Sequence, residues 1–429
     1  MREMKDSGIE WVGAIPQDWQ LSKIGSLYTQ RNEKVSDKDY QPLSVTMQGI
    51  LPQLATAAKT DDGDNRKLVR VGDFAINSRS DRRGSCGISP LDGSVSLINI
   101  ILTSRTAMHP GYYNWLFHTT LFADEFYKWG HGIVADLWTT RWQEMKSITV
   151  PVPEYAEQER IAAFLDAECA EIDAVLEKTR ASIEEYKKLK QAVITQAVTK
   201  GIRGDRPMKD SGIEWIGDIP AEWRKTQLRH CAAIKSGITL GKKYEKTDSL
   251  VERPYLRVAN VQDGYVDLSV LTTIEVTQDE DLKYRLRAGD VLMTEGGDRD
   301  KLGRGCVWHG EIEPCLHQNH IFAVQTSKDT LLPEFLEYLT VSDVGRSYFD
   351  VTAIKTTNLA CTSSSKVLAF TIPLPSVEEQ AEIVEALNTK CAGIDALVTK
   401  KQQYLTEIEN YKKSLIYEYV TGKKEVHPL

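Results

Sequence analysis

Apolar residues recur with a helical period over two long stretches of the chain, from about residue 157 to 199 and from about 379 to 421. In each stretch one row of positions seven residues apart is mostly apolar, and a second row three residues later completes a heptad-like seam. The first row is Leu165, Ile172, Thr179, Tyr186 and Val193 in one stretch and Leu387, Ile394, Lys401, Ile408 and Leu415 in the other; the second row is Val175, Leu189, Leu397, Tyr404 and Tyr411. A helix of this length spans about 65 Å and cannot bury its stripe alone. The two helices are therefore predicted to pack on each other, an ordinary core helix in each domain being the alternative.

The two stretches are copies of one another. Pro151 to Thr199 aligns without a gap with Pro373 to Thr421, at a constant offset of 222 residues. Both copies begin with a Pro-x-Pro-x-x-x-Glu-Gln sequence. A second repeat opens each half, since twelve of the sixteen residues from Met4 to Trp19 recur between Met208 and Trp223. The chain therefore consists of two units, each with an opening segment, a divergent middle and a long helix.

The two middles keep a common skeleton although most of their residues differ. Arg70–Asp73 matches Arg287–Asp290 ahead of an apolar strand, and a helix is expected near Pro110 and Pro333. Short β-rich runs with turn signals and one or two helices are typical of an α+β domain. The predicted ranges are 1–150 for the first α+β domain with its opening segment 4–19, 151–200 for the first long helix, 201–372 for a linker, the segment 208–223 and the second domain, and 373–429 for the second helix and tail.

Composition narrows the class of protein. The 429 residues are 41% hydrophobic and 27% charged, and no apolar run approaches the roughly 18 residues of a membrane span. Seven scattered cysteines and the lack of an apolar segment near the N-terminus favour a cytoplasmic protein. The net charge of −8 argues against a protein coated in basic residues, but it allows a local DNA-binding cleft.

The paired opening segment, the Pro-x-Pro-x-x-x-Glu-Gln entry to each helix and the two divergent middles resemble the specificity subunit of type I restriction–modification systems. The resemblance covers essentially the whole chain. It implies two target recognition domains separated by two long antiparallel, coiled-coil-like helices with an internal pseudo-twofold repeat. Each domain would read one half of a bipartite, non-palindromic site in double-stranded DNA, and the helices would set the gap and hold two identical methyltransferase subunits. The subunit itself would be non-catalytic and free of cofactors, because S-adenosylmethionine, ATP and Mg belong to the modification and restriction/translocase partners.

Residues that contact DNA are expected in loops of the two middles, because Arg and Asn read base edges while Lys, Ser and Thr contact phosphate. In the first middle the candidates are Arg79, Arg82 and Arg83 in a glycine-bearing run, and Thr139, Thr140, Arg141 and Trp142 in a later loop. In the second they are Arg299, Lys301 and Arg304, and Lys355, Thr356 and Asn358. The same register as residues 138–142 holds 360–364 in the second unit. The competing interpretations are a solvated turn for the first run and packing roles for Trp138 and Trp142; His320 and Asn319 are weaker candidates.

Other functions have less support in the sequence. Residues 237–243 faintly resemble a phosphate-binding loop but are one residue short and lack the Ser or Thr for Mg²⁺. A metal-dependent enzyme would need ligands such as Cys306, His309, Cys315, His317 and His320, whose spacing matches no usual zinc site. We therefore expect no metal. A coiled-coil scaffold without a DNA role remains the alternative, and it predicts no salt-dependent DNA affinity.

Overall fold

The computed structural model describes residues 2–53, 63–132, 138–245, 248–297, 302–355 and 360–426. The chain divides into two compact units. Unit 1 comprises Met1–Arg180 and Gln403–Leu429, and unit 2 comprises Ala181–Gln402. The division passes through both long helices, so each unit contains the first half of one helix and the last half of the other.

Unit 1 is an α+β domain in which the paired strands run antiparallel. Its main sheet has the order β10 (Cys86–Ile88), β9 (Phe74–Asn77), β12 (Asn99–Ser104), β4 (Tyr28–Arg31). Smaller sheets pair β1 (Met4–Asp6) with β2 (Ala14–Pro16), β3 (Gln20–Lys23) with β13 (Thr149–Val152), β6 (Leu43–Thr46) with β7 (Gly49–Pro52), and β8 (Arg66–Val69) with β11 (Gly93–Val95) and β5 (Lys34–Val35). The helices are α1 (Ile24–Leu27), α2 (Pro110–Phe117), α3 (Thr120–Lys128), α4 (Trp142–Met145) and the 3-10 turn η1 (Ser80–Arg82).

Unit 2 repeats this plan. Its main sheet has the order β17 (Ala232–Ser236), β24 (Ile321–Thr326), β20 (Val291–Thr294), β22 (Gly305–Val307). Further sheets pair β14 (Met208–Asp210) with β15 (Asp218–Pro220), β16 (Arg224–Gln227) with β27 (Thr371–Leu374), β18 (Leu250–Leu256) with β19 (Thr272–Thr277) and β23 (Leu316–His317), and β26 (Ala360–Cys361) with β21 (Gly296–Gly297) and β25 (Ile354–Lys355). The helices are α6 (Gln278–Tyr284), α7 (Pro333–Val341), α8 (Asp343–Thr352), α9 (Ser364–Ala369) and the 3-10 turns η3 (Leu228–His230) and η4 (Val258–Asn260).

The skeleton inferred from the sequence is visible at one turn of each sheet. The Asp73 carboxylate accepts the backbone N–H of Arg70 at 2.9 Å, and Asp290 accepts that of Arg287 at the same distance. Both aspartates are buried at the entry to a central strand, β9 or β20. Burial raises the pKa of Asp290, while the hydrogen bond from Arg287 opposes that rise. The shared sequence thus encodes a shared turn.

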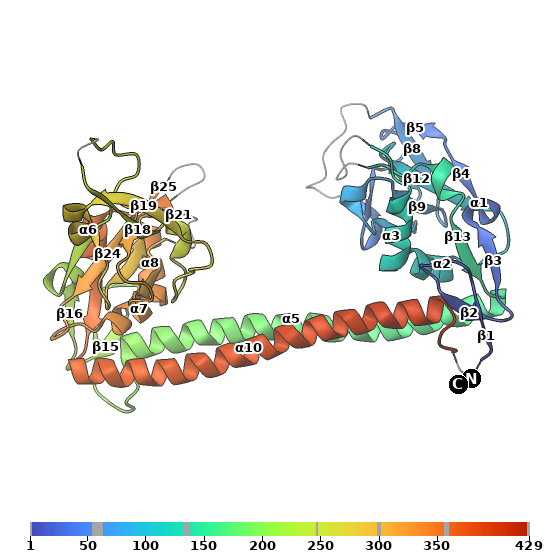
Figure 1. Cartoon of the computed structure of the whole chain (residues 1–429). Helices are drawn as coiled ribbons and strands as arrows, with labels where there is room; N and C mark the ends of the chain where they lie inside the picture. The colour runs from blue at the N-terminus through green and yellow to red at the C-terminus, as the bar shows by residue number, and fades with distance from the viewer. Residues whose placement is uncertain are drawn as a thin grey trace. The chain divides into compact units, whose positions relative to one another are not determined.

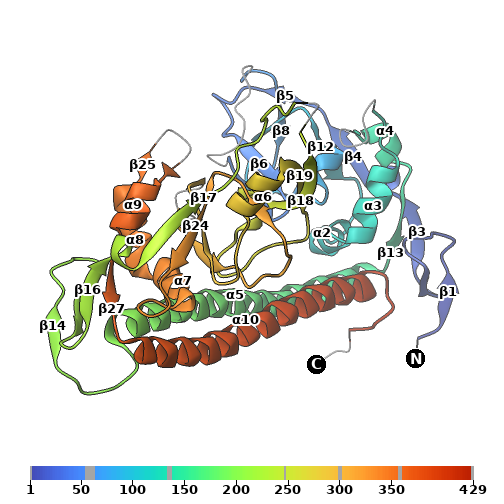
Figure 2. The same ribbon diagram turned by 60° about the vertical axis from the view of Figure 1, so that its left-hand side comes forward.

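The long helices are α5 (Tyr155–Lys200) and α10 (Val377–Val420), which run side by side in Figures 1 and 2. In unit 1 the Asp173 carboxylate pairs with Lys412 at 2.6 Å, and in unit 2 Lys190 pairs with Asp395 at 2.7 Å. Arg180 also pairs with Glu409, at 2.6 Å. In unit 2, Lys401 also lies over the Tyr186 ring. In each unit, a residue with a higher number on α5 contacts a residue with a lower number on α10, so the helices are antiparallel within each unit. Among the described residues, none of the helices has the length and apolarity that crossing a membrane requires.

The second row of the predicted seam is wrong. Val175, Leu189, Leu397, Tyr404 and Tyr411 are all exposed, between 39% and 55%. The first row, from Leu165 to Val193 and from Leu387 to Leu415, is buried or partly buried. The buried row beside it lies four residues later, at Cys169, Leu176, Ile183 and Ala197 on α5. Residues three and four positions apart both lie on one face of a helix. The row three residues after the first row is also apolar, so the sequence pattern did not distinguish it from the buried row four residues later.

The Glu-Gln pair at the start of α5 fastens unit 1 together. Glu157 accepts a 2.9 Å hydrogen bond from the Trp19 indole and pairs with Arg2, which also stacks over the Trp19 ring. Gln158 accepts the backbone N–H of His109 at 2.9 Å, just before α2, and donates to the Pro153 carbonyl at 2.8 Å. The repeated motif therefore joins the opening segment, α2 and the strand exit to one helix end.

Unit 2 makes the same contacts with the equivalent residues. Glu379 accepts the Trp223 indole N–H at 2.9 Å and pairs with Arg206 at 2.6 Å, while Gln380 accepts the backbone N–H of Leu332 at 2.8 Å. Arg206 belongs to the linker 201–207, whereas its counterpart Arg2 belongs to the N-terminus. In unit 2 the linker joins the end of α5 to the opening segment. In unit 1 the end of α10 and the opening segment take the same places, but they belong to the two ends of the chain.

Candidate DNA interface

The two candidate segments of the first middle lie together in unit 1. Thr140 donates its backbone N–H to the Ser78 carbonyl at 2.9 Å, and Ser80 donates to the Trp138 carbonyl at 2.8 Å. Arg79 and Thr139 form an isolated antiparallel bridge. Residues 78–85 and 138–142 therefore form one surface, which we call the unit 1 loop cluster.

Residues from α3 hold the first segment of this cluster in place. The Tyr127 hydroxyl donates to the carbonyls of Asn77 at 3.0 Å and Arg82 at 3.2 Å. Gly84 has φ of +73°, a left-handed conformation that favours glycine and lets the segment turn back toward β10. Burial raises the pKa of Tyr127 well above its ordinary value, so its hydroxyl stays protonated and able to donate. The run is a supported turn that projects arginines outward.

The three arginines of this cluster differ in their freedom. Arg82 is the most exposed, at 68% of its side chain, and its Nε lies 3.9 Å from Asp81. Arg79 pairs with Asp81 at 3.1 Å, and Arg83 pairs with Asp124 while lying over the Tyr127 ring. Exposed ion pairs of this kind are worth little in water, so a DNA phosphate can replace the carboxylates. Asp124 and Tyr127, which position Arg83, were not anticipated because their role depends on the packing of α3.

The second segment contributes less direct chemistry than expected. Thr140 is fully buried and its hydroxyl donates to the Phe126 carbonyl at 2.8 Å, so it fixes the loop rather than presenting a donor. Trp142 packs in part against the core, whereas Trp138 is exposed. Arg141 is exposed and its backbone N–H donates to Glu144 at 2.9 Å. Together with Thr139, which is partly buried, Arg141 remains a candidate for contact with DNA.

Unit 2 forms the corresponding cluster from the corresponding strands. Thr362 donates its backbone N–H to the Glu295 carbonyl at 2.7 Å, as Thr140 does to Ser78. β26 pairs with β21 on one side and β25 on the other. The predicted correspondence of residues 138–142 with 360–364 therefore agrees with the backbone pairing.

The chemistry presented in unit 2 differs from that in unit 1. His320 Nδ1 lies 2.5 Å from the Glu295 carboxylate, an exposed pair at the entry to β24. Arg304 is partly buried beyond the turn that leads to β22, and Lys355 lies on β25. The candidates Arg299, Lys301, Thr356 and Asn358 lie outside the described residues. The pairing of His320 with Glu295 was missed because the two residues are 25 positions apart and neither belongs to the basic runs.

The structure accounts for the two alternative sites considered from the sequence, the Cys/His cluster and the glycine-bearing segment 237–243. Cys306, Cys315 and His317 are buried, and desolvation lowers the pKa of His317 to about 4, which keeps it neutral. Among the described residues, His, Cys, Asp and Glu form no group of three that suits a metal ion. A Cβ added to Gly237 would collide with the backbone carbonyls of His317 and Gln318. Close backbone packing therefore accounts for glycine at that position.

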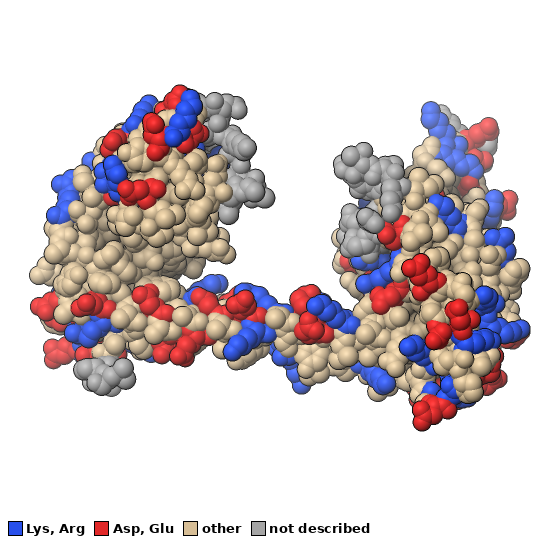
Figure 3. Space-filling model, turned by 180° about the vertical axis from the view of Figure 1, so that it is seen from behind, with Lys and Arg blue, Asp and Glu red and all other residues tan. Residues whose placement is uncertain are grey.

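Charge on the visible face of the helices is mixed. Figure 3 shows acidic and basic side chains interspersed along them. This pattern agrees with ion pairs such as Arg180–Glu409 and with the net charge of −8. This helix face therefore presents no continuous basic surface.

Comparison with known proteins supports the resemblance. The chain is 24% identical to the MjaVIII specificity subunit of Methanocaldococcus jannaschii, over 97% of this chain and 95% of that protein. It is 25% identical to the EcoKI specificity subunit of Escherichia coli K12, but the match covers 64% of this chain and 58% of the relative. The match to the putative MjaX specificity subunit, also from Methanocaldococcus jannaschii, is 25% identical and spans about half of each chain, 48% and 47%.

A solved structure supports the fold independently. A chain from a study of complex assembly and conformational transition in a type I restriction–modification system has a TM-score of 0.72, with 16% identity, and the match covers 96% of this chain and 99% of that one. No family model matches the sequence. The sequence relatives are specificity subunits of type I restriction enzymes, which agrees with the resemblance, and the solved structure shares the mixed α and β fold of this chain.

Proposed function

We propose that this chain is the DNA-reading subunit of a type I restriction–modification complex, in which each unit recognises one half of a bipartite, non-palindromic site. The observation that carries the proposal is that the two units share the contacts at the start of each long helix but differ in their loop clusters. The contacts of Glu157 and Gln158 recur at Glu379 and Gln380, yet the loop clusters carried by the same backbone pairing present different side chains. Two units with the same backbone plan and different loop side chains suit a DNA target with two different halves.

Arg82 is the residue of unit 1 best placed to contact DNA. Its guanidinium is exposed and only loosely paired, and Arg forks onto guanine O6 and N7 or onto a phosphate. Arg79 and Arg83 would exchange their carboxylate partners for phosphate oxygens. In unit 2, Lys355 on β25 and the His320–Glu295 pair belong to the corresponding cluster, and Arg304 lies just before β22. These residues supply the differing half-site contacts in the proposal.

Two identical methyltransferase subunits would dock on surfaces that the repeat duplicates. In unit 1 Val175 and Tyr411 are exposed apolar residues, and in unit 2 the equivalent positions hold Leu397 and Leu189, also exposed. Each pair lies at one level of the antiparallel helices, because Asp173 faces Lys412 and Lys190 faces Asp395 close by. Equivalent heptad positions on two antiparallel helices lie on the same side of the pair. The two exposed apolar pairs would therefore offer the same kind of docking surface to each of two identical partners.

The helix pair would set the gap between the half-sites. Helices of about 65 Å would suit half-sites about one helical turn, or about 34–36 Å, apart. Inserting four residues near Ala181 adds about 6 Å to α5. The recognised gap should then change by one or two base pairs. Catalysis and its cofactors, S-adenosylmethionine, ATP and Mg, would belong to the modification and restriction/translocase subunits.

Exchange of one reader tests this function. Residues 20–150 are replaced by the equivalent domain of another specificity subunit, and the site bound by the assembled complex is determined by selection from random DNA. One half of the site should change while the other half and the gap persist. Binding should weaken steeply with salt, because phosphate contacts release counterions. A scaffold without a DNA role would show neither selection nor a salt-dependent affinity.

A further inference from the structure

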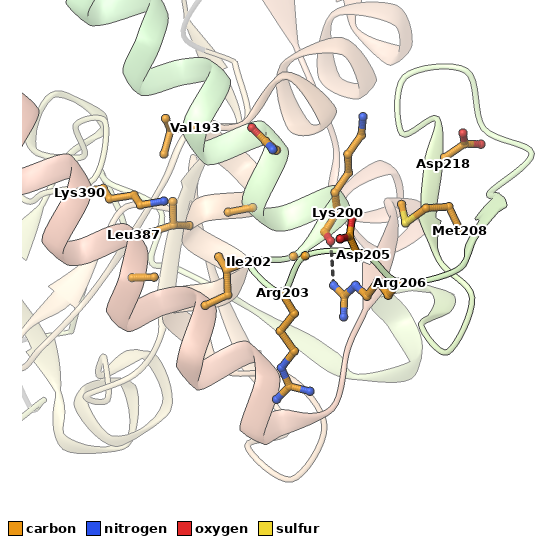
Figure 4. A pocket seen from close by; sticks show the side chains of 15 residues that line it. Val193, Lys200, Ile202, Arg203, Asp205, Arg206, Met208, Asp218, Leu387 and Lys390 are labelled. Carbon is orange, nitrogen blue, oxygen red and sulfur yellow. Dashed lines mark hydrogen bonds between the residues drawn. The ribbon is translucent and has the colours of Figure 1, made fainter.

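A pocket of about 440 Å³ opens in unit 2 where the chain leaves α5 and crosses to the second opening segment. Figure 4 shows Val193 of α5, Leu387 and Lys390 of α10, and Ile202 and Arg203 of the linker around it. Its lining includes two small apolar residues, Ala197 on α5 and Ala386 on α10. The linker closes one side, and Arg206 fastens the linker by donating to the Lys200 carbonyl at 2.7 Å.

The repeat shows what this space is shaped to hold. At the offset of 222 residues, Ala386 corresponds to Phe164 and Ala197 corresponds to Tyr419. In unit 1 the rings of Phe164 and Tyr419 contact each other, with centroids 4.4 Å apart, and pack against the core. Unit 1 therefore fills the corresponding position with two aromatic rings of its own, and unit 2 has alanines there.

The charged residues that line the pocket are of both signs. Its lining includes Lys200, Arg203, Arg206 and Lys390 against Asp205 and Asp218. The two arginines are paired with glutamates outside the lining, Glu382 and Glu379. Among the described residues, Lys200 and Lys390 make no ion pair, so their ammonium groups are available. Unit 1 has Glu168 where unit 2 has Lys390, and Gly422 where it has Lys200.

We propose that this pocket binds an aromatic ring accompanied by a carboxylate, presented by the modification subunit as an aromatic side chain beside an acidic residue. The missing rings define the apolar part, and Lys390 and Lys200 define the acidic part. Since unit 1 occupies the equivalent space itself, the contact forms once per chain and distinguishes two otherwise equivalent partner positions. The identity of the partner rests on the proposed function, whereas the chemistry of the pocket does not.

The chemistry is tested with 4-fluorophenylacetate and the full chain, by fluorine NMR titration. Binding in the millimolar range is expected for a molecule of about ten heavy atoms. 4-Fluorophenethylamine, with the same ring and the opposite charge, should bind at least tenfold more weakly. Equal binding of the two compounds, or no saturable binding of the carboxylate, overturns the assignment.

Two variants built from the residues of unit 1 locate the binding. Ala197→Tyr with Ala386→Phe should fill the pocket, abolish probe binding and leave the unfolding temperature unchanged or higher. Lys390→Glu should keep the cavity and weaken binding of the carboxylate at least fivefold. The charge variant keeps the inference testable if the double variant does not fold. Undiminished binding by either folded variant contradicts the site.

The partner is tested by titrating purified modification subunit against the wild-type chain and the filled variant. One of the two binding steps should weaken at least fivefold in the filled variant while the other is unchanged. Equal binding to both chains overturns the once-per-chain contact. Failure of the modification subunit to bind the wild-type chain would instead contradict the proposed function.

Discussion

The carboxylate of Asp173 lies 2.6 Å from the ammonium group of Lys412, and the repeat converts this pair into Asp395 and Lys190, which lie 2.7 Å apart. The relationship is reciprocal: the position that is Asp on one helix meets the position that is Lys on the other, in both units. This is the contact pattern of an isologous interface, formed here by two copies within one chain. It fixes the register of α5 against α10.

Charge reversal of one pair should show the coupling. Asp173→Lys or Lys412→Asp alone places like charges together, and the double exchange restores attraction. Since these side chains are partly exposed, a double-mutant cycle should give a coupling of about 0.2–1 kcal/mol. Denaturant unfolding measures it. The Asp395–Lys190 pair is the matched control and should give a similar value, whereas zero coupling in both pairs would contradict the reciprocal register.

Removal of Glu379 should destabilise unit 2 strongly. Glu379→Ala leaves the Trp223 indole N–H without its acceptor and removes one of the two carboxylate partners of the buried Arg206 guanidinium, Glu222 remaining at 3.1 Å. Leaving a buried donor without its acceptor in this way costs about 1–3 kcal/mol, and more where the donor is charged. Glu382→Ala, which breaks the exposed pair with Arg203, should change the free energy of unfolding little, because water screens exposed ion pairs. Comparable losses for the two variants in denaturant unfolding would refute this role of the Glu-Gln motif.

Stability should depend on pH through Glu337 on α7. Burial, with Glu334 and Asp263 nearby, raises the pKa of its carboxyl from 4.5 to about 7. The folded protein then holds a proton that the unfolded chain releases, so stability is greatest at low pH and falls as pH rises from about 4.5 to about 7. Relative to Glu337→Gln, the wild-type free energy of unfolding should fall by roughly 2–3 kcal/mol over this range. The control is Glu334→Gln, and parallel pH profiles for wild type and Glu337→Gln would contradict the prediction.

Replacement of Arg82 should weaken DNA binding. Arg82→Ala removes an exposed guanidinium worth about 1–3 kcal/mol if it contacts a base, and it lowers the salt slope by about one if it contacts a phosphate. Fluorescence anisotropy with the assembled complex measures both effects. Arg70→Ala, in the same unit but paired with Asp92 at another turn, is the control and should bind normally. Equal affinity of wild type and Arg82→Ala would remove Arg82 from the interface.

The sequence alone is sufficient to predict the elements that the two units share, because a pattern that occurs twice at matching positions indicates the same local structure in both units. The shared turn at Asp73 and Asp290 and the correspondence of residues 138–142 with 360–364 both appear in the structure. The errors lie where local pattern leaves a choice. Val175 and Leu189 are as apolar as Leu176 and Ile183, and only the packing of the helices shows which row is buried.

The candidate site shows the same limit. Basic residues in loops were identified from composition, but the burial of Thr140 and the support of Arg83 by Asp124 and Tyr127 depend on how α3 packs. The pairing of His320 with Glu295 joins residues from separate segments. Unit 2 has alanines at the positions equivalent to Phe164 and Tyr419. The sequence does not show that these two positions are adjacent in space, whereas the structure places the two rings in contact.

Selection of bound sites from random DNA, comparing the wild-type complex with one in which Arg79, Arg82 and Arg83 are alanine, tests the central claim most directly. The wild-type complex should select two short motifs separated by a fixed gap. The variant should lose preference in one motif and retain the other motif at the same distance. A single continuous motif, or equal loss of preference in both halves, would contradict the division of recognition between the two units.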